Sequence, residues 1–119
     1  MKGFTLLEVL VALTIIAVAL AASMRGAMSL TANAEDTRLK LLATIEAQNR
    51  LLELRLAHQS LTVGQTQYDC EQGGIKMSCE QNIKSTPNPF FRRVEVRVSR
   101  AEADNPRLLV ELLTVMPAN

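Results

Sequence analysis

The chain has 119 residues and a formal net charge of +1, with 48% hydrophobic residues but only 3% aromatic ones. This length allows one small domain beside a membrane segment. The charge is nearly balanced, and no basic patch contains interleaved aromatic residues, which argues against a nucleic-acid-binding protein. The apolar surplus is aliphatic and is concentrated in the first 24 residues.

The apolar segment from Phe4 to Met24 is long enough to cross a bilayer as a helix. Its 21 residues would extend about 32 Å, close to the hydrocarbon thickness of about 30 Å. Glu8 is an acidic residue inside this segment, where an unpaired carboxylate costs on the order of 3 kcal/mol if it lies deep. We therefore expect Glu8 to be paired with a cation, or to lie at the interface in the first helical turn, where the helix dipole favours it.

The start of the chain also contains a longer string, which is Gly3-Phe4-Thr5-Leu6-Leu7-Glu8-Val9-Leu10-Val11-Ala12-Leu13. This string resembles the processing and assembly sequence of type IV pilins and type II secretion pseudopilins. The resemblance implies that prepilin peptidase cuts between Gly3 and Phe4, and that Phe4 is then N-methylated. It also implies that Glu8, the fifth residue counted from Phe4, docks the subunit during assembly. Residues 1–3 would then be a short leader with one positive charge, Lys2.

A cleaved secretory signal peptide is the alternative interpretation of this start. Lys2 would be its basic region, and Ala19-Leu20-Ala21 has the small-x-small form of a cleavage site. Glu8 inside the apolar run, the length of that run and the helical pattern beyond it argue against this alternative. If it holds, the mature protein is a secreted soluble binding module that begins near Ala22.

Beyond Met24 the pattern predicts that the helix continues, as an amphipathic helix, to about Ala57. Glu46 and Arg50 are spaced for a favourable i,i+4 ion pair. The predicted buried stripe consists of leucine and isoleucine residues at helical spacing, namely Leu41, Ile45, Leu52 and Leu56, flanked by Leu42 and Leu51.

The same helix carries a second motif, made of Asn49, Arg50, Leu51, Glu53, Leu54, Arg55 and Leu56. It resembles the helix of the I-type minor pseudopilins of type II secretion. The implied partners are the J-type and K-type minor pseudopilins, other pseudopilins, prepilin peptidase and the inner-membrane assembly platform. The helix would contact its partners through small residues that allow close packing, namely Ala12, Ala17, Ala19, Ala21 and Ala22.

The region from Thr62 to Ser85 reads as two strands joined at Gly73-Gly74. A four-residue loop from Gly73 to Lys76 would pair Gln72 with Met77, and therefore Cys70 with Cys79. In an oxidising periplasm this favours a disulfide, which contributes about 2–3 kcal/mol for so short a loop. Zinc would need two further ligands, and redox catalysis would need a Cys-x-x-Cys pair. The single histidine, His58, is expected to be a surface residue.

Two more strands are predicted after the proline-containing loop from Ser85 to Pro89. The first, Phe91 to Arg100, alternates with Val94, Val96 and Val98 on its buried face. Ala103-Asp104-Asn105-Pro106 is expected to form a turn. The second strand, Leu108 to Met116, is apolar on both faces around Glu111. We therefore expect it to be central in the sheet or covered by the helix.

Together these features predict an α+β, pilin-like fold, in which a long N-terminal helix, half transmembrane and half amphipathic, packs on a small antiparallel sheet. The expected organisation is a leader at 1–3, a transmembrane helix at 4–24 and a periplasmic domain at 25–119, with the N-terminus cytoplasmic and the anchor in the inner membrane. No catalytic pair, phosphate loop or metal-ligand spacing is present, so we expect a structural protein without cofactor or metal.

The expected function is that of a minor pseudopilin in the tip complex of the type II secretion pseudopilus, with a minor pilin of a type IV pilus as the alternative. Glu102 and Asp104 are too sparse for a calcium loop. By the resemblance, the lack of such a loop favours a minor over the major subunit, and Glu8 argues against the largest minor subunit.

Overall fold

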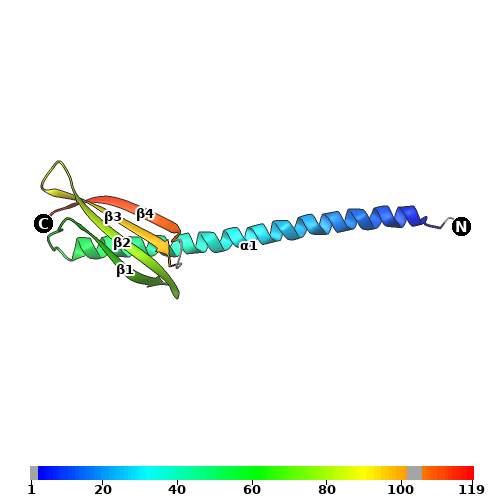
Figure 1. The fold of residues 1–119 in the computed structure, drawn as a ribbon, viewed down its shortest axis with the longest axis horizontal. Helices are drawn as coiled ribbons and strands as arrows, with labels where there is room; N and C mark the ends of the chain where they lie inside the picture. Colours follow the sequence, from blue (N-terminus) through cyan, green and yellow to red (C-terminus); the bar gives the residue numbers. More distant parts are fainter. Residues whose placement is uncertain (1–2, 102–105) are drawn as a thin grey trace. The chain divides into compact units, whose positions relative to one another are not determined.

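The computed structural model describes residues 3–101 and 106–119 of the chain. One helix, α1 (Leu6–Leu56), precedes four strands, β1 (Gly64–Gln72), β2 (Ile75–Ser85), β3 (Phe91–Arg100) and β4 (Leu108–Pro117) (Figure 1). The predicted α+β fold, a long N-terminal helix with an antiparallel sheet, is confirmed. The predicted turn residues Ala103, Asp104 and Asn105 lie outside the described residues, as do Glu102 and Lys2.

The chain divides into two compact units, residues 1–37 and 38–119. In the first unit α1 continues through Gly26 without interruption. Most of its large aliphatic side chains are more than half exposed, among them Leu7, Leu13, Ile16 and Leu20. The helix contains a stretch that is long and apolar enough to cross a membrane.

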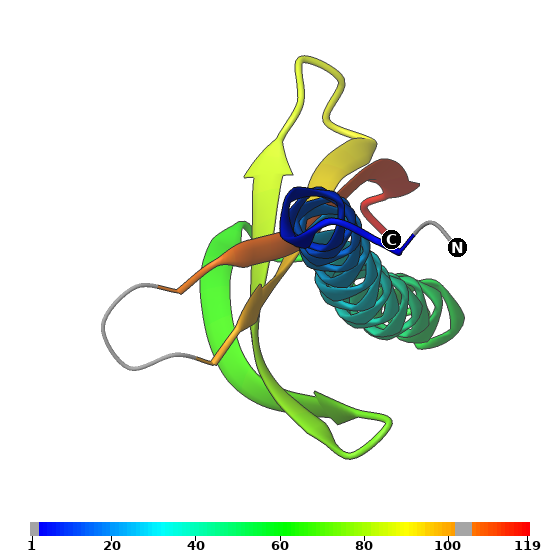
Figure 2. The same ribbon diagram turned by 90° about the vertical axis from the view of Figure 1, so that its right-hand side faces the viewer.

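The second unit combines residues 38–56 of α1 with the whole sheet. The strands follow one another in the order β1-β2-β3-β4, and each neighbouring pair is antiparallel. Figure 2 shows the sheet along one side of this part of the helix, with the opposite side uncovered. The core between helix and sheet consists of Leu39, Ala43, Ala47, Leu61, Met77, Cys79, Ile83, Val94, Val96, Val98, Leu109 and Met116.

The helix turns a face toward the sheet that differs from the predicted one. Ala43 and Ala47 are completely buried, one helical turn apart. Leu41, Leu52 and Leu56, which were predicted to form the buried stripe, are 60%, 51% and 74% exposed. The prediction was wrong because this segment has two apolar faces at helical spacing, and the sheet covers the one with small side chains. Alanines let the helix backbone approach the sheet closely.

The turn between β1 and β2 is tighter than predicted. It contains only Gly73 and Gly74, both with positive φ (60° and 77°), as a two-residue hairpin loop of type I′ requires. Gln72 therefore pairs with Ile75, not with Met77. A Cβ atom on Gly73 would also lie 3.1 Å from the Leu42 side chain, so the turn sits directly against α1.

The last two strands agree with the predicted alternation and correct one expectation. Val94, Val96 and Val98 are completely buried in β3. The strand β4 lies at an edge of the sheet, so a central position was wrong, but its Leu109 and Met116 lie in the core between helix and sheet, in keeping with the other alternative. Its Met116 is buried, whereas Leu113 and Val115, on the opposite face, are about half exposed. Apolar residues on both faces therefore did not indicate a central position, because only one face of β4 is covered.

Candidate functional site

The first turn of α1 holds Thr5 and Glu8 in a reciprocal pair of hydrogen bonds. The Thr5 backbone N–H donates to the Glu8 carboxylate (N···Oε2 3.1 Å), and the Glu8 backbone N–H donates to the Thr5 hydroxyl (N···Oγ1 3.2 Å). This is a capping box, which satisfies two of the amide groups that a helix start leaves without partners. The Thr-x-x-Glu spacing is a sequence signal for it, and Thr5 is the functional residue that our sequence reasoning missed here.

Gly3 and Phe4 precede the helix and are exposed. Phe4 is 91% exposed, and neither residue belongs to a helix or strand. A Cβ atom on Gly3 would meet nothing within 4 Å. The predicted cleavage bond therefore lies in an exposed segment outside the helix, beside the Thr5–Glu8 cap. The processing roles of Gly3 and Phe4 stay predictions.

In the second unit, Cys70 and Cys79 form a disulfide with a Cα–Cα distance of 6.0 Å. The pairing geometry differs from the predicted one, because Cys70 lies opposite Met77 and Cys79 lies opposite Tyr68. The two cysteines are diagonal neighbours on the helix-facing side of the hairpin. A shift of register by two residues keeps every side chain on its face, and for this reason the disulfide forms despite the tighter turn.

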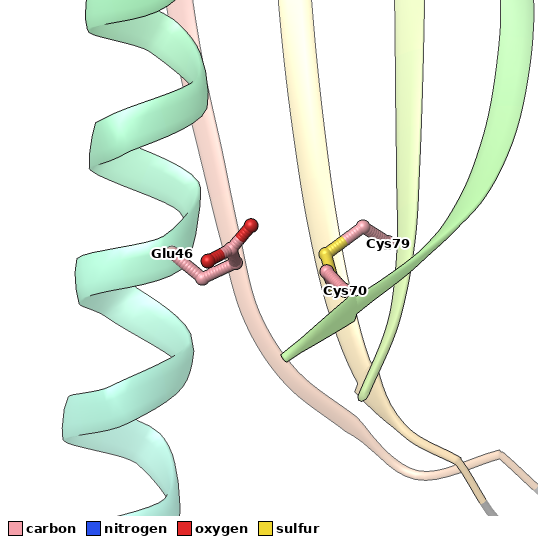
Figure 3. A group of neighbouring side chains, drawn as sticks. All are labelled: Glu46, Cys70 and Cys79. Carbon is pink, nitrogen blue, oxygen red and sulfur yellow. A yellow bond between two sulfur atoms is a disulfide. The ribbon is translucent and has the colours of Figure 1, made fainter. Parts of the chain in front are cut away.

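Glu46 of α1 points at this disulfide (Figure 3). One carboxylate oxygen of Glu46 and the sulfur atoms of Cys70 and Cys79 lie within 4.8 Å of one another. Carboxylate oxygen and cysteine sulfur are donor types that bind metal ions, but in this form of the protein the two sulfur atoms are joined in the disulfide and offer no thiolate. No sequence motif indicated this group, because Glu46 is separated from Cys70 by the rest of the helix and most of β1.

Arg50 is a polar connection between α1 and the sheet. Its Nε donates to Gln81 Oε1 (2.7 Å), its Nη1 forms an ion pair with Glu53 (3.1 Å), and its guanidinium carbon lies 5.2 Å from the centre of the Tyr68 ring. We predicted a pair between Arg50 and Glu46, but these contacts direct Arg50 to other partners. Burial raises the pKa of Tyr68.

The uncovered side of α1 in the second unit presents an apolar surface. We define the outer face as Leu41, Leu52 and Leu56, the exposed leucines of this part of the helix. Beside it lies a shallow groove of about 260 Å³, lined by Gln48, Leu51, Leu52, Arg55 and Thr114. Large exposed side chains next to an apolar groove are typical of a protein–protein contact surface.

His58 ends the helix and lies away from these features. It has a positive φ of 47°, the left-handed conformation that commonly ends a helix. Its side chain is exposed, as predicted.

Both parts of the chain match known protein families or motifs. Residues 38–117 match the family model described as type II secretion system protein I, and residues 1–24 match the prokaryotic N-terminal methylation motif. The type II secretion system protein I of Pseudomonas aeruginosa is 36% identical over 110 residues, which cover 92% of this chain and 85% of that protein. The Klebsiella pneumoniae protein of the same name is 29% identical over 103 residues, covering 87% and 85%. The chain belongs to the type II secretion system protein I family.

Proposed function

We propose that this protein is a minor pseudopilin, a structural subunit that takes part in starting the pseudopilus of the type II secretion system. The observation that carries the proposal is the uncovered apolar surface on α1, which extends from Leu6 to Leu30 and resumes in the outer face. A helix that is apolar on all sides needs lipid or other helices around it. Membership of the protein I family supports the type II secretion system as the setting of these contacts.

The first unit would act as the anchor. Its apolar segment would cross the inner membrane, with Lys2 on the cytoplasmic side and the second unit in the periplasm. The positive-inside rule favours this orientation, and a periplasmic location favours the Cys70–Cys79 disulfide. The proposed processing is cleavage between Gly3 and Phe4 with methylation of Phe4, in keeping with the matched N-terminal methylation motif.

Glu8 would have two roles in this anchor. In the monomer its Oε2 accepts the Thr5 amide hydrogen bond, which stabilises the start of the helix. That bond uses one carboxylate oxygen and leaves Oε1 for the ammonium group of a neighbouring processed subunit. Such an ion pair is strong in a low-dielectric environment, so it would dock an incoming subunit without breaking the cap.

The two roles of Glu8 can be separated by substitution. Glu8→Gln keeps an acceptor for the capping bond but removes the charge, and Thr5→Ala keeps the charge but removes the hydroxyl of the cap. We expect Glu8→Gln and Glu8→Val to insert into the membrane normally and to lose secretion and subunit crosslinking. Thr5→Ala should retain most of the secretion and most of the subunit crosslinking. Normal secretion by Glu8→Gln would show that Glu8 acts only as a cap.

The outer face would contact the helices of other pseudopilins, and we propose the J-type and K-type minor subunits as these partners. Leu52→Glu should reduce co-purification with them, because it places a charge in the apolar contact. Val63→Glu is the matched control, since Val63 is 59% exposed in the segment between α1 and β1. Equal effects of the two substitutions would contradict the proposed surface.

The first measurement to make is the intact mass and the N-terminal residue of the protein from its native membrane. A chain that begins with N-methylated Phe4 supports the anchor. A soluble chain that begins near Ala22 would mean that the apolar segment was a cleaved signal peptide, and the assembly proposal would fail. Loss of pilus formation, with secretion intact, after deletion of the gene would identify the alternative, a minor pilin.

A further inference from the structure

Glu46 places a carboxylate beside both sulfur atoms of the Cys70–Cys79 disulfide (Figure 3). The three residues come from α1, β1 and β2, and their ligand atoms lie within 4.8 Å of one another. We propose that the reduced form of this protein binds one Zn²⁺ ion through Glu46, Cys70 and Cys79. Water would be the fourth ligand.

The donor atoms suit zinc. Two thiolates and one carboxylate, with metal–ligand distances of about 2.3 Å and 2.0–2.2 Å, form three corners of a tetrahedral site. Thiolate donors select zinc over magnesium and calcium, which prefer oxygen ligands. Cys79 is completely buried, whereas Glu46 and Cys70 are half-buried, so the site would be shielded from solvent on the side of Cys79 only.

The backbone already holds the two cysteines in a suitable arrangement. They lie on neighbouring strands, on the same face of the hairpin, with their Cα atoms 6.0 Å apart. The Gly73-Gly74 turn keeps this pairing in place without the disulfide, because both glycines adopt the positive φ that the two-residue loop needs. Reduction therefore leaves both sulfur atoms facing Glu46.

The chemistry balances with a dithiol as the reductant. The dithiol gives two electrons and two protons to the Cys70–Cys79 bond and becomes a disulfide itself, so that two thiols form. Each thiol then releases its proton as it binds Zn²⁺, while the Glu46 carboxylate binds without releasing one. Affinity for zinc should consequently fall as the pH is lowered, because protons compete for the two thiolates.

The two oxidation states would tie together different elements. The disulfide joins only β1 to β2. A zinc ion would also join the hairpin to α1 through Glu46, and would hold the thiols back from oxidation. Zinc would thus stabilise the contact between helix and sheet in a chain whose disulfide has not yet formed.

The test uses the full chain in detergent micelles, reduced with a dithiol that is then removed under anaerobic conditions. Co²⁺ serves as a spectroscopic probe, because tetrahedral thiolate coordination gives visible and charge-transfer absorption bands. Zn²⁺ should then displace Co²⁺. We expect one ion per reduced chain and none per oxidised chain.

Two matched variants identify the third ligand. Glu46→Gln should weaken metal binding by about tenfold or more. Glu71→Gln is the control, because Glu71 adjoins Cys70 in sequence but is exposed, and it should bind as tightly as the unchanged protein. Equal affinity of Glu46→Gln and the unchanged protein would overturn the proposal. Equal metal binding by the oxidised chain would overturn it as well.

Circular dichroism covers the case in which reduction unfolds the protein. If the reduced chain loses its β-sheet signal without metal, one equivalent of Zn²⁺ must restore it. A reduced chain that stays unfolded with Zn²⁺, or that stays folded and takes up no metal, would refute the site. None of these results depends on the secretion function, so this proposal and the proposed function can fail separately.

Discussion

The two parts of α1 use similar residues in different ways. In residues 6–24, large apolar side chains are exposed around the whole helix. In residues 38–56, alanines are buried against the sheet, and Leu41, Leu52 and Leu56 are exposed. Both parts, then, expose leucines that face away from the chain's own core, whereas Leu39 of the second part is buried in that core. The exposed leucines of both parts are available for contacts outside the chain, which we propose are made with lipid by the first part and with other subunits by the second.

The largest effect on stability should come from placing a large side chain on the buried alanine face of residues 38–56. Ala47→Leu puts a large side chain into a position with no exposed area. We expect it to lower the free energy of unfolding by about 1–3 kcal/mol through overpacking. Guanidinium unfolding in micelles measures this change. Leu52→Ala is the control, and it should cost no more than about 0.5 kcal/mol. A larger loss in Leu52→Ala than in Ala47→Leu would break the comparison.

The next effect concerns Tyr68 on the covered side. Its hydroxyl is buried and has no hydrogen-bond partner in the described part of the chain, and an unsatisfied buried hydroxyl is costly. Tyr68→Phe should therefore raise the free energy of unfolding by about 1 kcal/mol. No change, or a loss of stability, would mean that the hydroxyl does have a partner.

The same residue predicts how stability changes at alkaline pH. Burial raises the pKa of Tyr68 above its ordinary value of about 10, so the folded chain keeps a proton that the unfolded chain has lost. The contribution of Tyr68 to the free energy of unfolding is complete below about pH 10, and it is lost as the pH rises through the pKa that Tyr68 has in the folded chain. Between pH 9 and 11, the free energy of unfolding should decline less in Tyr68→Phe than in the unchanged protein.

A smaller effect is expected in the first part of α1, where the Thr5–Glu8 cap lies. Thr5→Ala removes the hydroxyl that accepts the Glu8 amide hydrogen bond, which should cost about 0.5–1 kcal/mol of local helix stability. Amide hydrogen exchange in micelles should be faster in the first turn and unchanged in the strands. Thr5→Ser is the matched control, because its hydroxyl can still accept. Faster exchange throughout the sheet would contradict a purely local role.

The smallest effect is expected at the end of the helix. His58 has a φ of 47°, which glycine adopts without steric cost. His58→Gly should raise the free energy of unfolding by roughly 0.5 kcal/mol. Thermal unfolding of His58→Gly tests this expectation. The matched control is Gln59→Gly, which introduces a glycine at the next residue. A loss of stability in His58→Gly would mean that the imidazole contributes contacts that outweigh the strain.

Much of the fold could be predicted because it follows from local patterns. The 3.6-residue period predicted α1, and the alternation of Val94, Val96 and Val98 predicted β3 and its buried face. The hairpin followed from Gly73-Gly74. The register of that hairpin could not be predicted from the glycines alone, since they allow loops of different lengths. The tightest loop forms because both glycines take positive φ.

The candidate sites likewise divide into those that a local motif predicts and those that depend on tertiary packing. The family motif marks Gly3, Phe4 and Glu8 because it lies within consecutive residues. Glu46 was missed because its partners are distant in sequence, and only the packing of α1 on the hairpin brings it to the cysteines.

The sequence by itself determined the apolar anchor segment, the order of helix and strands, and the cysteines that form the disulfide. Each of these depends on residues close in the chain, or on an alternation that fixes which side chains share a face. Only the tertiary structure decided which face of α1 meets the sheet, which strands lie at its edges, and that Glu46 faces the disulfide. These depend on how closely the alanine face lets the sheet approach, a property of packing between elements that no single segment contains.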